Sequence, residues 1–270
     1  MADPNAAFVG SIPHAYDAYL GPLLFHEFAD DLAARVPVAP SARVLETACG
    51  TGILTERLLR RLGGQGAIVA TDLNEAMFAH AQRRGVAGLG LEWRQADGTN
   101  LPFDDASFDA VVCQFGLMFF PDKAAGVREA FRVLKPGGRY LFNVWDAIDA
   151  NPVPKIAFEA SVQYFPESPP QFMRVPFSLH DPAPIRAWLA DAGFQNIESR
   201  TLSKVGASPS AAEAAIGLVE GSPLYTEIMN RRPEALADIK AMVAANIAAG
   251  FGDHPVRCPL RAHVFSAQRP

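Results

Sequence analysis

The stretch from residue 43 to residue 62 constrains the fold of this chain most, because it predicts a strand, a tight turn and a helix in immediate succession. Residues 43–47 (RVLET) form the predicted strand, and the small residues 48–52 (ACGTG) form the turn. The helix that follows has one apolar face, which carries Leu54, Leu58 and Leu62 at four-residue spacing. A strand joined to a helix by a short turn is the first half of a βαβ unit, so a parallel sheet is predicted.

The alternation of strands and helices continues to residue 145. Further strands are predicted at 67–71, 91–95, 108–113 and 139–145, with one helix between Asn74 and Gly85 and another from Asp122 to Leu134. Pro136-Gly137-Gly138 is expected to break the chain ahead of the last of these strands. Strands and helices at this spacing form right-handed βαβ units around one sheet.

After residue 145 the pattern changes. Residues 146–180 are rich in proline and aromatic residues and show no clear period. A helix from Asp181 to Gly193, a strand at 194–205, helices at 210–231 and 233–249, and a closing strand at 261–267 are predicted to follow. The expected fold class is therefore α/β: a Rossmann-like, doubly wound, seven-stranded sheet, mostly parallel with an antiparallel closing strand, plus helical lid insertions.

One domain spanning residues 1–270 is expected, since no linker or repeat divides the chain. Residues 1–40 are predicted to form an N-terminal helical lid, in which Leu24, Phe28 and Leu32 make one buried face. Residues 41–145 form the core that would hold a ligand. The segments 146–193 and 206–257 are insertions that would lie over it.

Composition excludes several classes of function. Lys and Arg number 24 and Asp and Glu number 29, so the net charge of −5 argues against a nucleic-acid partner. No apolar run reaches the roughly 20 residues of a membrane span, and the N-terminal residues resemble no signal peptide, so a soluble, cytoplasmic protein is expected. The three cysteines form no CxxC pair, and the six histidines show no HxH or HExxH spacing, so no metal site is expected.

Candidate binding residues follow four successive predicted strands. The turn at 48–52 follows the first, Asp72 ends the second, Asp97-Gly98 follows the third, and Gln114-Phe115-Gly116 follows the fourth. The carboxyl ends of parallel strands meet at one edge of a sheet, where ligands bind at the point of strand-order reversal. A common site is predicted there.

The turn distinguishes between two kinds of adenosine ligand. Asp72 could accept from a ribose diol in either a dinucleotide or another nucleoside. A dinucleotide turn requires a third glycine, which is absent after Gly52, and Glu46 would repel a pyrophosphate. Glu46 fits better opposite an ammonium group. A ligand with adenosine at one end and a cationic amino acid at the other therefore satisfies these positions.

In these motifs the chain resembles the class I S-adenosylmethionine-dependent methyltransferases, and in particular the subgroup with the quinone-biosynthesis C-methyltransferases. The resemblance covers about residues 40–145 and is carried by the segments VLETACGTG (44–52), Asp72, Asp97-Gly98, LPF (101–103), SFD (107–109) and VLKPGG (133–138). One departure is Ala48, where the family usually has its first glycine. Slightly altered packing of the turn is expected there, without loss of the cofactor.

The resemblance implies S-adenosyl-L-methionine as cofactor and a role for each matching residue. Glu46, with the backbone of Ala48, Gly50 and Gly52, would hold the methionine moiety. Asp72 would take the ribose hydroxyls, Leu73 and Met77 would pack on the adenine, Asp97 and Gly98 would meet its amino group, and Gln114 and Phe115 would line the sulfonium side. In the N-terminal lid, Tyr16 would bind the cofactor carboxylate and Phe25 would shield the sulfonium.

The methyl acceptor is expected to be a small or medium-sized organic molecule with an O-, C- or N-nucleophile, because aromatic residues dominate the insertions. Methyl transfer depends mainly on alignment, so no catalytic residue is assigned among His14, His26, His180 and His254. A non-catalytic regulatory subunit that binds the cofactor is the alternative, with a nicotinamide-dependent oxidoreductase less favoured because GxGxxG and Tyr-xxx-Lys are absent. A homodimer is left open. Substitution of Asp72 is expected to weaken cofactor binding far more than folding.

Overall fold

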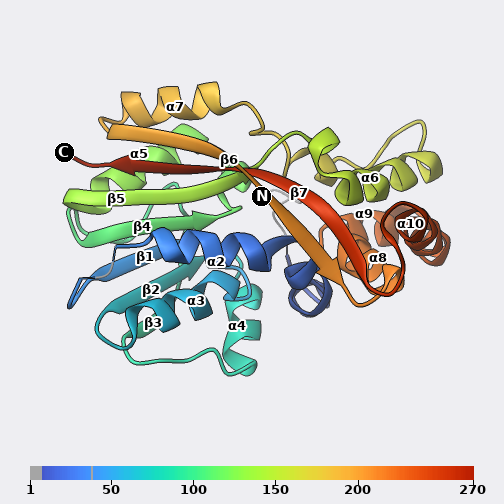
Figure 1. The fold of residues 1–270 in the computed structure, drawn as a ribbon, viewed down its shortest axis with the longest axis horizontal. Coiled ribbons are helices and arrows are strands. Elements are labelled where there is room, and N and C mark those ends of the chain that lie inside the picture. The colour runs from blue at the N-terminus through green and yellow to red at the C-terminus, as the bar shows by residue number, and fades with distance from the viewer. Residues whose placement is uncertain (1–7, 38) are drawn as a thin grey trace.

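The computed structural model describes residues 8–37 and 39–270, so residues 1–7 and 38 of the expected N-terminal lid lie outside the described part. The fold is one seven-stranded sheet with the strand order β3-β2-β1-β4-β5-β7-β6 (Figure 1). The strands are β1 (Arg43–Thr47), β2 (Ala67–Asp72), β3 (Leu91–Gln95), β4 (Phe108–Gln114), β5 (Leu134–Trp145), β6 (Gln195–Ser208) and β7 (Val256–Gln268). Strands β1 to β5 pair in parallel, whereas β7 is antiparallel to both β5 and β6. This confirms the predicted fold class.

The helices cover both faces of the sheet and one end of it. They are α1 (Ile12–Ala15), α2 (His26–Arg35), α3 (Ile53–Leu62), α4 (Glu75–Arg83), α5 (Lys123–Val133), α6 (Pro152–Tyr164), α7 (Pro182–Asp191), α8 (Ala211–Glu220), α9 (Leu224–Arg231) and α10 (Leu236–Phe251). A π-helix, η2 (Tyr16–Phe25), joins α1 to α2, and short 3₁₀ turns lie at 117–119, 148–150, 172–174 and 233–235. Helix α2 packs on α3 and α5 packs on α7, and right-handed crossovers on either side of β1 place α3 and α5 on opposite faces.

Strands β6 and β7 extend beyond the rest of the sheet. Strand β7 pairs with β5 only from Ala262 to Gln268, whereas its pairing with β6 continues to Val256, opposite Ser208. The extension projects past Trp145, the carboxyl end of β5, and so past the edge where a ligand is expected. Because the chain between β6 and β7 holds α8, α9 and α10, this two-stranded ribbon places those helices beyond that edge, beside α6 (Figure 1). We call α6, α8, α9 and α10 the helical half.

Four predictions of local structure are wrong. Helix α6 was not predicted because its buried side consists mainly of small residues, among them Ala157, Ala160 and Ser161, which give little hydrophobic periodicity. The predicted helix 210–231 is divided into α8 and α9 at 221–223, where Gly221 caps the end of α8 and Pro223 has no backbone N–H to continue the helical hydrogen bonds.

The third error concerns residues 135–138, which do not separate a helix from a strand. Strand β5 already begins at Leu134, which pairs with Phe108, and the register then shifts so that Ala110 pairs with Arg139. The proline and glycines form the extra residues of this bulge. The closing strand β7 is also longer than predicted and begins at Val256 rather than at residue 261.

The N-terminal segment is helical as expected, although it is one continuous run from Ile12 to Arg35 with Pro22 inside its π-helical part. Leu24, Phe28 and Leu32 are buried, which confirms the predicted apolar face. Helix η2 packs against α8 and β6 and also contacts α3. It therefore lies between the sheet and the helical half.

Candidate active site

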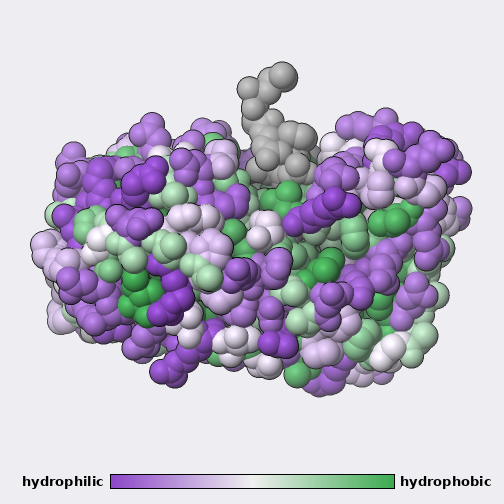
Figure 2. Space-filling model, turned by 90° about the horizontal axis from the view of Figure 1, so that it is seen from above, coloured by the Kyte–Doolittle hydropathy of each residue, from purple (hydrophilic) through white to green (hydrophobic). Residues whose placement is uncertain are grey.

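A cavity of about 430 Å³ lies at the carboxyl edge of the parallel strands. Its walls come from the N-terminal helix, from the strand ends of the core and from both predicted insertions. Most of the predicted site residues line it: Tyr16, Phe25, Ala48, Gly50, Asp72, Leu73, Met77, Asp97, Gly98, Gln114 and Phe115. Glu46 and Gly52 do not line it. On the face shown in Figure 2, apolar residues are interspersed among hydrophilic ones, with several near the middle of the face.

Glu46 lies at the end of β1, below the turn rather than on the cavity wall. Its side chain is almost fully buried, with 1% of its surface exposed, and accepts a hydrogen bond of 2.6 Å from the Thr55 hydroxyl. Burial raises the pKa of Glu46 to about 8, and the nearby charge of Asp72 adds to the rise, while the bond from Thr55 opposes it. At neutral pH the carboxyl group of the ligand-free protein is therefore mostly protonated. A cation brought close to it would favour the ionised form.

Gly52 shapes the turn from outside the cavity. Its φ of 80° lies in the left-handed region, and it is the N-cap of α3. A Cβ atom at this position would come within 3.0 Å of the Trp93 ring and 3.1 Å of Ala81. Only glycine satisfies both the conformation and the space, so Gly52 supports the turn, and direct contact with a ligand stays a prediction.

Asp72, at the end of β2, joins two turns. Its Oδ2 accepts from the backbone N–H of Gly50 at 2.9 Å, and its Oδ1 accepts from that of Asn74 at 2.8 Å. The side chain is 8% exposed, and burial raises its pKa above the usual range while these backbone bonds oppose the rise. Both carboxylate oxygens are therefore hydrogen-bonded within the protein. Asp72 is thus a buried acceptor that joins the β1 turn to the β2 turn, so its replacement should destabilise the fold as well as weaken cofactor binding.

Ala48 and Phe115 hold left-handed backbone conformations at the ends of β1 and β4, with φ angles of 52° and 49°. Gly116 makes room for Ala48, since a Cβ atom on Gly116 would lie 2.4 Å from the Ala48 methyl carbon. The N–H of Phe115 donates to Asn143 Oδ1 at 3.0 Å, which fixes the second turn. The methyl group of Ala48, in the turn after β1, thus fits because the turn after β4 has a glycine opposite it.

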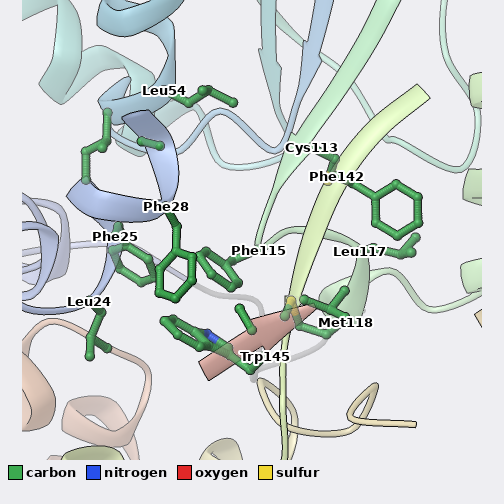
Figure 3. Packing of buried hydrophobic residues seen from close by; sticks show 14 of the residues in the cluster. Leu24, Phe25, Phe28, Leu54, Cys113, Phe115, Leu117, Met118, Phe142 and Trp145 are labelled. Carbon is green, nitrogen blue, oxygen red and sulfur yellow. The ribbon is translucent and has the colours of Figure 1, made fainter. Parts of the chain in front are cut away.

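Aromatic rings form a continuous wall of the cavity. The rings of Phe115 and Trp145 stack with centroids 3.9 Å apart and an angle of 11°, and Phe25 and Phe28 pack against both (Figure 3). Tyr16 stacks on Phe25 at 4.9 Å. This wall joins the N-terminal helix to the ends of β4 and β5 and excludes water from that side of the cavity.

The N-terminal helix is also attached through polar groups. Gln114 Nε2 donates to the backbone carbonyl of Phe25 at 2.9 Å, so Gln114 both lines the cavity and holds the end of η2. Burial raises the pKa of the Tyr16 phenol, and the charges of Asp72 and Asp17 raise it further. Tyr16 is therefore a neutral hydrogen-bond donor at physiological pH.

The opposite end of the cavity combines an open apolar surface with an exposed carboxylate. Leu73 is 49% exposed, which is unusual for a leucine, whereas Met77 beside it is buried. Asp97 is exposed, and its Oδ1 accepts from both the N–H and the hydroxyl of Thr99. A flat, partly polar ring would cover the side chain of Leu73 and still reach the Asp97 loop.

Many lining residues were not predicted individually. They share an apolar character and come from distant segments: Phe8, Leu20, Leu24, Phe119, Phe120, Trp145, Pro154, Phe172, Met173, Phe177 and Leu218. The aromatic richness of residues 146–180 was the available signal, but it did not show which rings face the cavity. None of the four histidines considered as bases lines the cavity. Within residues 8–37 and 39–270, no three His, Cys, Asp or Glu side chains are grouped to hold a metal.

Sequence comparison relates the chain to methyltransferases. A family model described as a methyltransferase domain matches residues 44–138. The chain is 33% identical over 183 residues to the ubiquinone/menaquinone biosynthesis C-methyltransferase UbiE of Idiomarina loihiensis, a match that covers 60% of this chain and 69% of the relative. The UbiE protein of Yersinia pestis is 34% identical over the same length and coverage.

Solved structures with this fold have lower sequence identity. The phosphoethanolamine N-methyltransferase 2 of Haemonchus contortus, solved with S-adenosyl-L-methionine, matches with a TM-score of 0.61 and 18% identity, over 96% of this chain and 56% of that one. The YcgJ protein of Bacillus subtilis matches with a TM-score of 0.57 and 19% identity, over 91% of this chain and all of that one. At these identities the likeness shows a shared fold. In the described part of this chain, no helix is both long and apolar enough to cross a membrane.

Proposed function

Because the chain belongs to the class I S-adenosylmethionine-dependent methyltransferases and resembles among them the ubiquinone/menaquinone C-methyltransferases, we propose that it methylates a small or medium-sized apolar organic acceptor. The observation that carries this proposal is the cavity at the carboxyl edge of β1, β2 and β4, which has polar groups at one end and aromatic rings at the other. The nicotinamide-dependent and non-catalytic alternatives gain no support from the relatives.

The residues at the polar end fit S-adenosylmethionine. Asp72 lines the cavity and would accept from the ribose hydroxyls, and the exposed Leu73 with Met77 offers an apolar surface for adenine. Asp97 can accept from the adenine amino group. These positions support binding of the nucleoside along the ends of β2 and β3.

The methionine end of the cofactor would lie toward the turn after β1 and the N-terminal helix. The Tyr16 hydroxyl would donate to the carboxylate, and Glu46, below the turn, would balance the ammonium charge by ionising. Phe25, Phe115 and Trp145 would surround the sulfonium and exclude water from it. The bound cofactor supplies an electrophilic methyl group.

This chain's residues would act by alignment. In-line displacement at the methyl carbon requires the nucleophile, the carbon and the leaving sulfur to lie on one line, and holding reactants in that geometry can supply most of the rate acceleration. The stacked rings of Phe115 and Trp145 would form one wall for an acceptor, and Phe172 and Phe177 line the cavity from the first insertion. The apolar walls favour an acceptor that is itself apolar.

Binding and transfer can be tested separately. S-adenosylmethionine and its demethylated product should each raise the melting temperature, since a ligand at 100 times its Kd stabilises by about 2.7 kcal/mol, whereas NAD should not. Acceptors should then be screened with methyl-labelled cofactor and mass spectrometry, using apolar phenols, quinols and amines. Stabilisation by NAD alone would overturn the cofactor assignment, and cofactor binding without transfer to any acceptor would count against an enzyme.

A further inference from the structure

Asp17 joins the N-terminal helix to the predicted cofactor turn and to α4. Its Oδ1 accepts from the Thr51 hydroxyl at 3.1 Å, and Thr51 lies in the turn between Gly50 and Gly52. Its Oδ2 lies 2.8 Å from Arg84 Nε and 3.3 Å from His80 Nε2. Only 12% of the Asp17 side chain is exposed, so water and salt screen these interactions weakly.

Arg84 contacts both Asp17 and the turn residue Thr51. Its guanidinium donates to the Thr51 carbonyl at 3.2 Å and pairs with Glu56 of α3 at 2.8 Å. Asp17 and Arg84 therefore hold the side chain and the carbonyl of the same turn residue. Gly50, next to Thr51, donates its N–H to Asp72. Through Gly50, the network is therefore connected to Asp72, the predicted ribose-binding residue.

The rest of helix η2 is closely packed against β6 and α8. A Cβ atom at Gly206 of β6 would lie 2.1 Å from the Leu23 carbonyl oxygen, and one at Gly217 of α8 would lie 2.9 Å from the Leu20 nitrogen. Such close backbone contacts couple η2 to the ribbon and to the helical half. Asp17 therefore attaches η2, together with the ribbon and helices packed on it, to the turn at 48–52 and to α4.

We propose that Asp17 is a positioning residue that closes the cavity over the cofactor and limits how fast the cofactor exchanges. This inference rests on the proposed function. Tyr16 and Phe25 of the same helix line the cavity, so movement of this wall would widen the route by which the cofactor enters or leaves. Breaking the Asp17 network favours the open form whether or not ligand is bound. Association and dissociation should both accelerate while Kd changes little.

The test measures binding kinetics of S-adenosylhomocysteine by stopped-flow tryptophan fluorescence, since Trp145 lines the cavity. For Asp17→Asn we expect both rate constants to rise about tenfold, the change expected when a partly buried charged hydrogen bond is lost. Arg84→Gln should have the same effect, and the double variant should add little. Tyr16→Phe should instead raise dissociation alone, because it removes a ligand contact.

Asp30→Asn is the matched control. Asp30 of α2 pairs with Arg57 of α3 at 2.8 Å, so it also attaches the N-terminal segment to the core, but neither residue lines the cavity. Its rate constants should equal those of the wild-type protein. Unchanged rates in Asp17→Asn, equal acceleration by Asp30→Asn, or a rise in dissociation alone would each overturn the proposal.

A second measurement separates this proposal from the proposed function. If the wild-type protein bound no S-adenosylhomocysteine, the cofactor assignment would fail. Whether Asp17 holds helix η2 against the turn and α4 could still be measured without ligand. Backbone amides of residues 16–25 should then exchange hydrogen faster in Asp17→Asn than in Asp30→Asn. Equal exchange in the two variants would show that Asp17 does not hold the helix.

Discussion

At the residue scale, the two turns beside the cavity hold side-chain-bearing residues in a conformation that favours glycine. Ala48 and Phe115 both have positive φ angles, a state that costs about 1–3 kcal/mol and persists only where neighbours enforce it. Gly116 and Asn143 provide that enforcement. The backbone groups of these turns are consequently fixed before any ligand arrives.

The contact between Gly116 and Ala48 leads to the first prediction. Gly116→Ala places a methyl group 2.4 Å from the Ala48 methyl and 2.8 Å from Cys113 Sγ, and we expect a loss of about 1–3 kcal/mol in unfolding free energy. Urea denaturation measures it. Ala48→Gly in the same chain should recover part of the loss, because it removes one of the two clashes. An unchanged free energy of unfolding in Gly116→Ala would contradict the close contact between Gly116 and Ala48.

Glu46 gives a prediction about pH. Its folded pKa of about 8 exceeds the ordinary value of 4.5, so the folded protein binds a proton that the unfolded chain has released. The stability linked to Glu46 is fully present below pH 4.5 and is lost as the pH rises through about 8. Glu46→Gln keeps an acceptor for Thr55 and cannot ionise. Urea denaturation from pH 5 to 9 should show the variant gaining stability relative to the wild-type protein as pH rises.

The same group predicts proton release on cofactor binding. An ammonium group close to Glu46 favours its ionised form, so binding at pH 7 should expel a proton, and the binding enthalpy should depend on the ionisation enthalpy of the buffer. Glu46→Gln should abolish that dependence. Calorimetry in phosphate and in Tris would show it, and a wild-type enthalpy that does not vary with buffer would remove Glu46 from the methionine site.

At the scale of elements, glycines allow η2 and α8 to approach closely. Gly217→Ala would place a methyl group 2.9 Å from the Leu20 nitrogen, and we expect it to destabilise the protein by about 1–3 kcal/mol despite the better helix propensity of alanine. Gly250→Ala in α10 is the control, since no atom lies within 4 Å of that site. It should stabilise by up to about 1 kcal/mol. Thermal unfolding of both variants distinguishes packing from propensity.

The elements of the core could be predicted, and those of the helical half could be predicted only in part. Strands β1 and β3 have the predicted bounds, because Val44 and Leu45 of β1 lead directly into a turn of small residues and Leu91 and Trp93 of β3 alternate with polar residues. Helix α6 buries small side chains against distant helices, so its position depends on tertiary contacts that no local pattern records. The same holds for the site. Asp72 could be found because it stands at the end of a predicted strand. The role of Asp17 could not, because its partners lie 34 or more positions away in the sequence.

At the scale of the whole molecule, the cavity is assembled from two parts of the chain with different chemistry. The first 145 residues contribute its carboxylates and also much of its aromatic wall, whereas the insertions contribute mainly apolar side chains. This division supports the proposal that residues 146–193 and 206–257 shape the acceptor pocket. Affinity for cofactor and choice of acceptor should therefore respond to different substitutions.

Phe172→Leu tests this separation. Phe172 is buried, stacks beside Phe119 and lines the cavity from the first insertion. Leucine keeps the site apolar, so we expect a stability loss of less than about 1.5 kcal/mol and an unchanged Kd for S-adenosylhomocysteine, with altered KM values across acceptors. Asp72→Ala should instead weaken cofactor binding and also destabilise the fold. A tenfold higher Kd for S-adenosylhomocysteine in Phe172→Leu would show that Phe172 contributes to cofactor binding as well as to acceptor choice.

The ribbon of β6 and β7 has a consequence for how such an enzyme can diversify. Its outer part, from residue 203 to 208 and from 256 to 261, carries α8, α9 and α10 past the sheet edge without support from β5. A change of twist or bend along this arm would raise or lower the helices as one body and alter the room for an acceptor, with every cofactor contact retained. Directed evolution toward larger acceptors should therefore accumulate substitutions along the arm, at positions that touch no ligand.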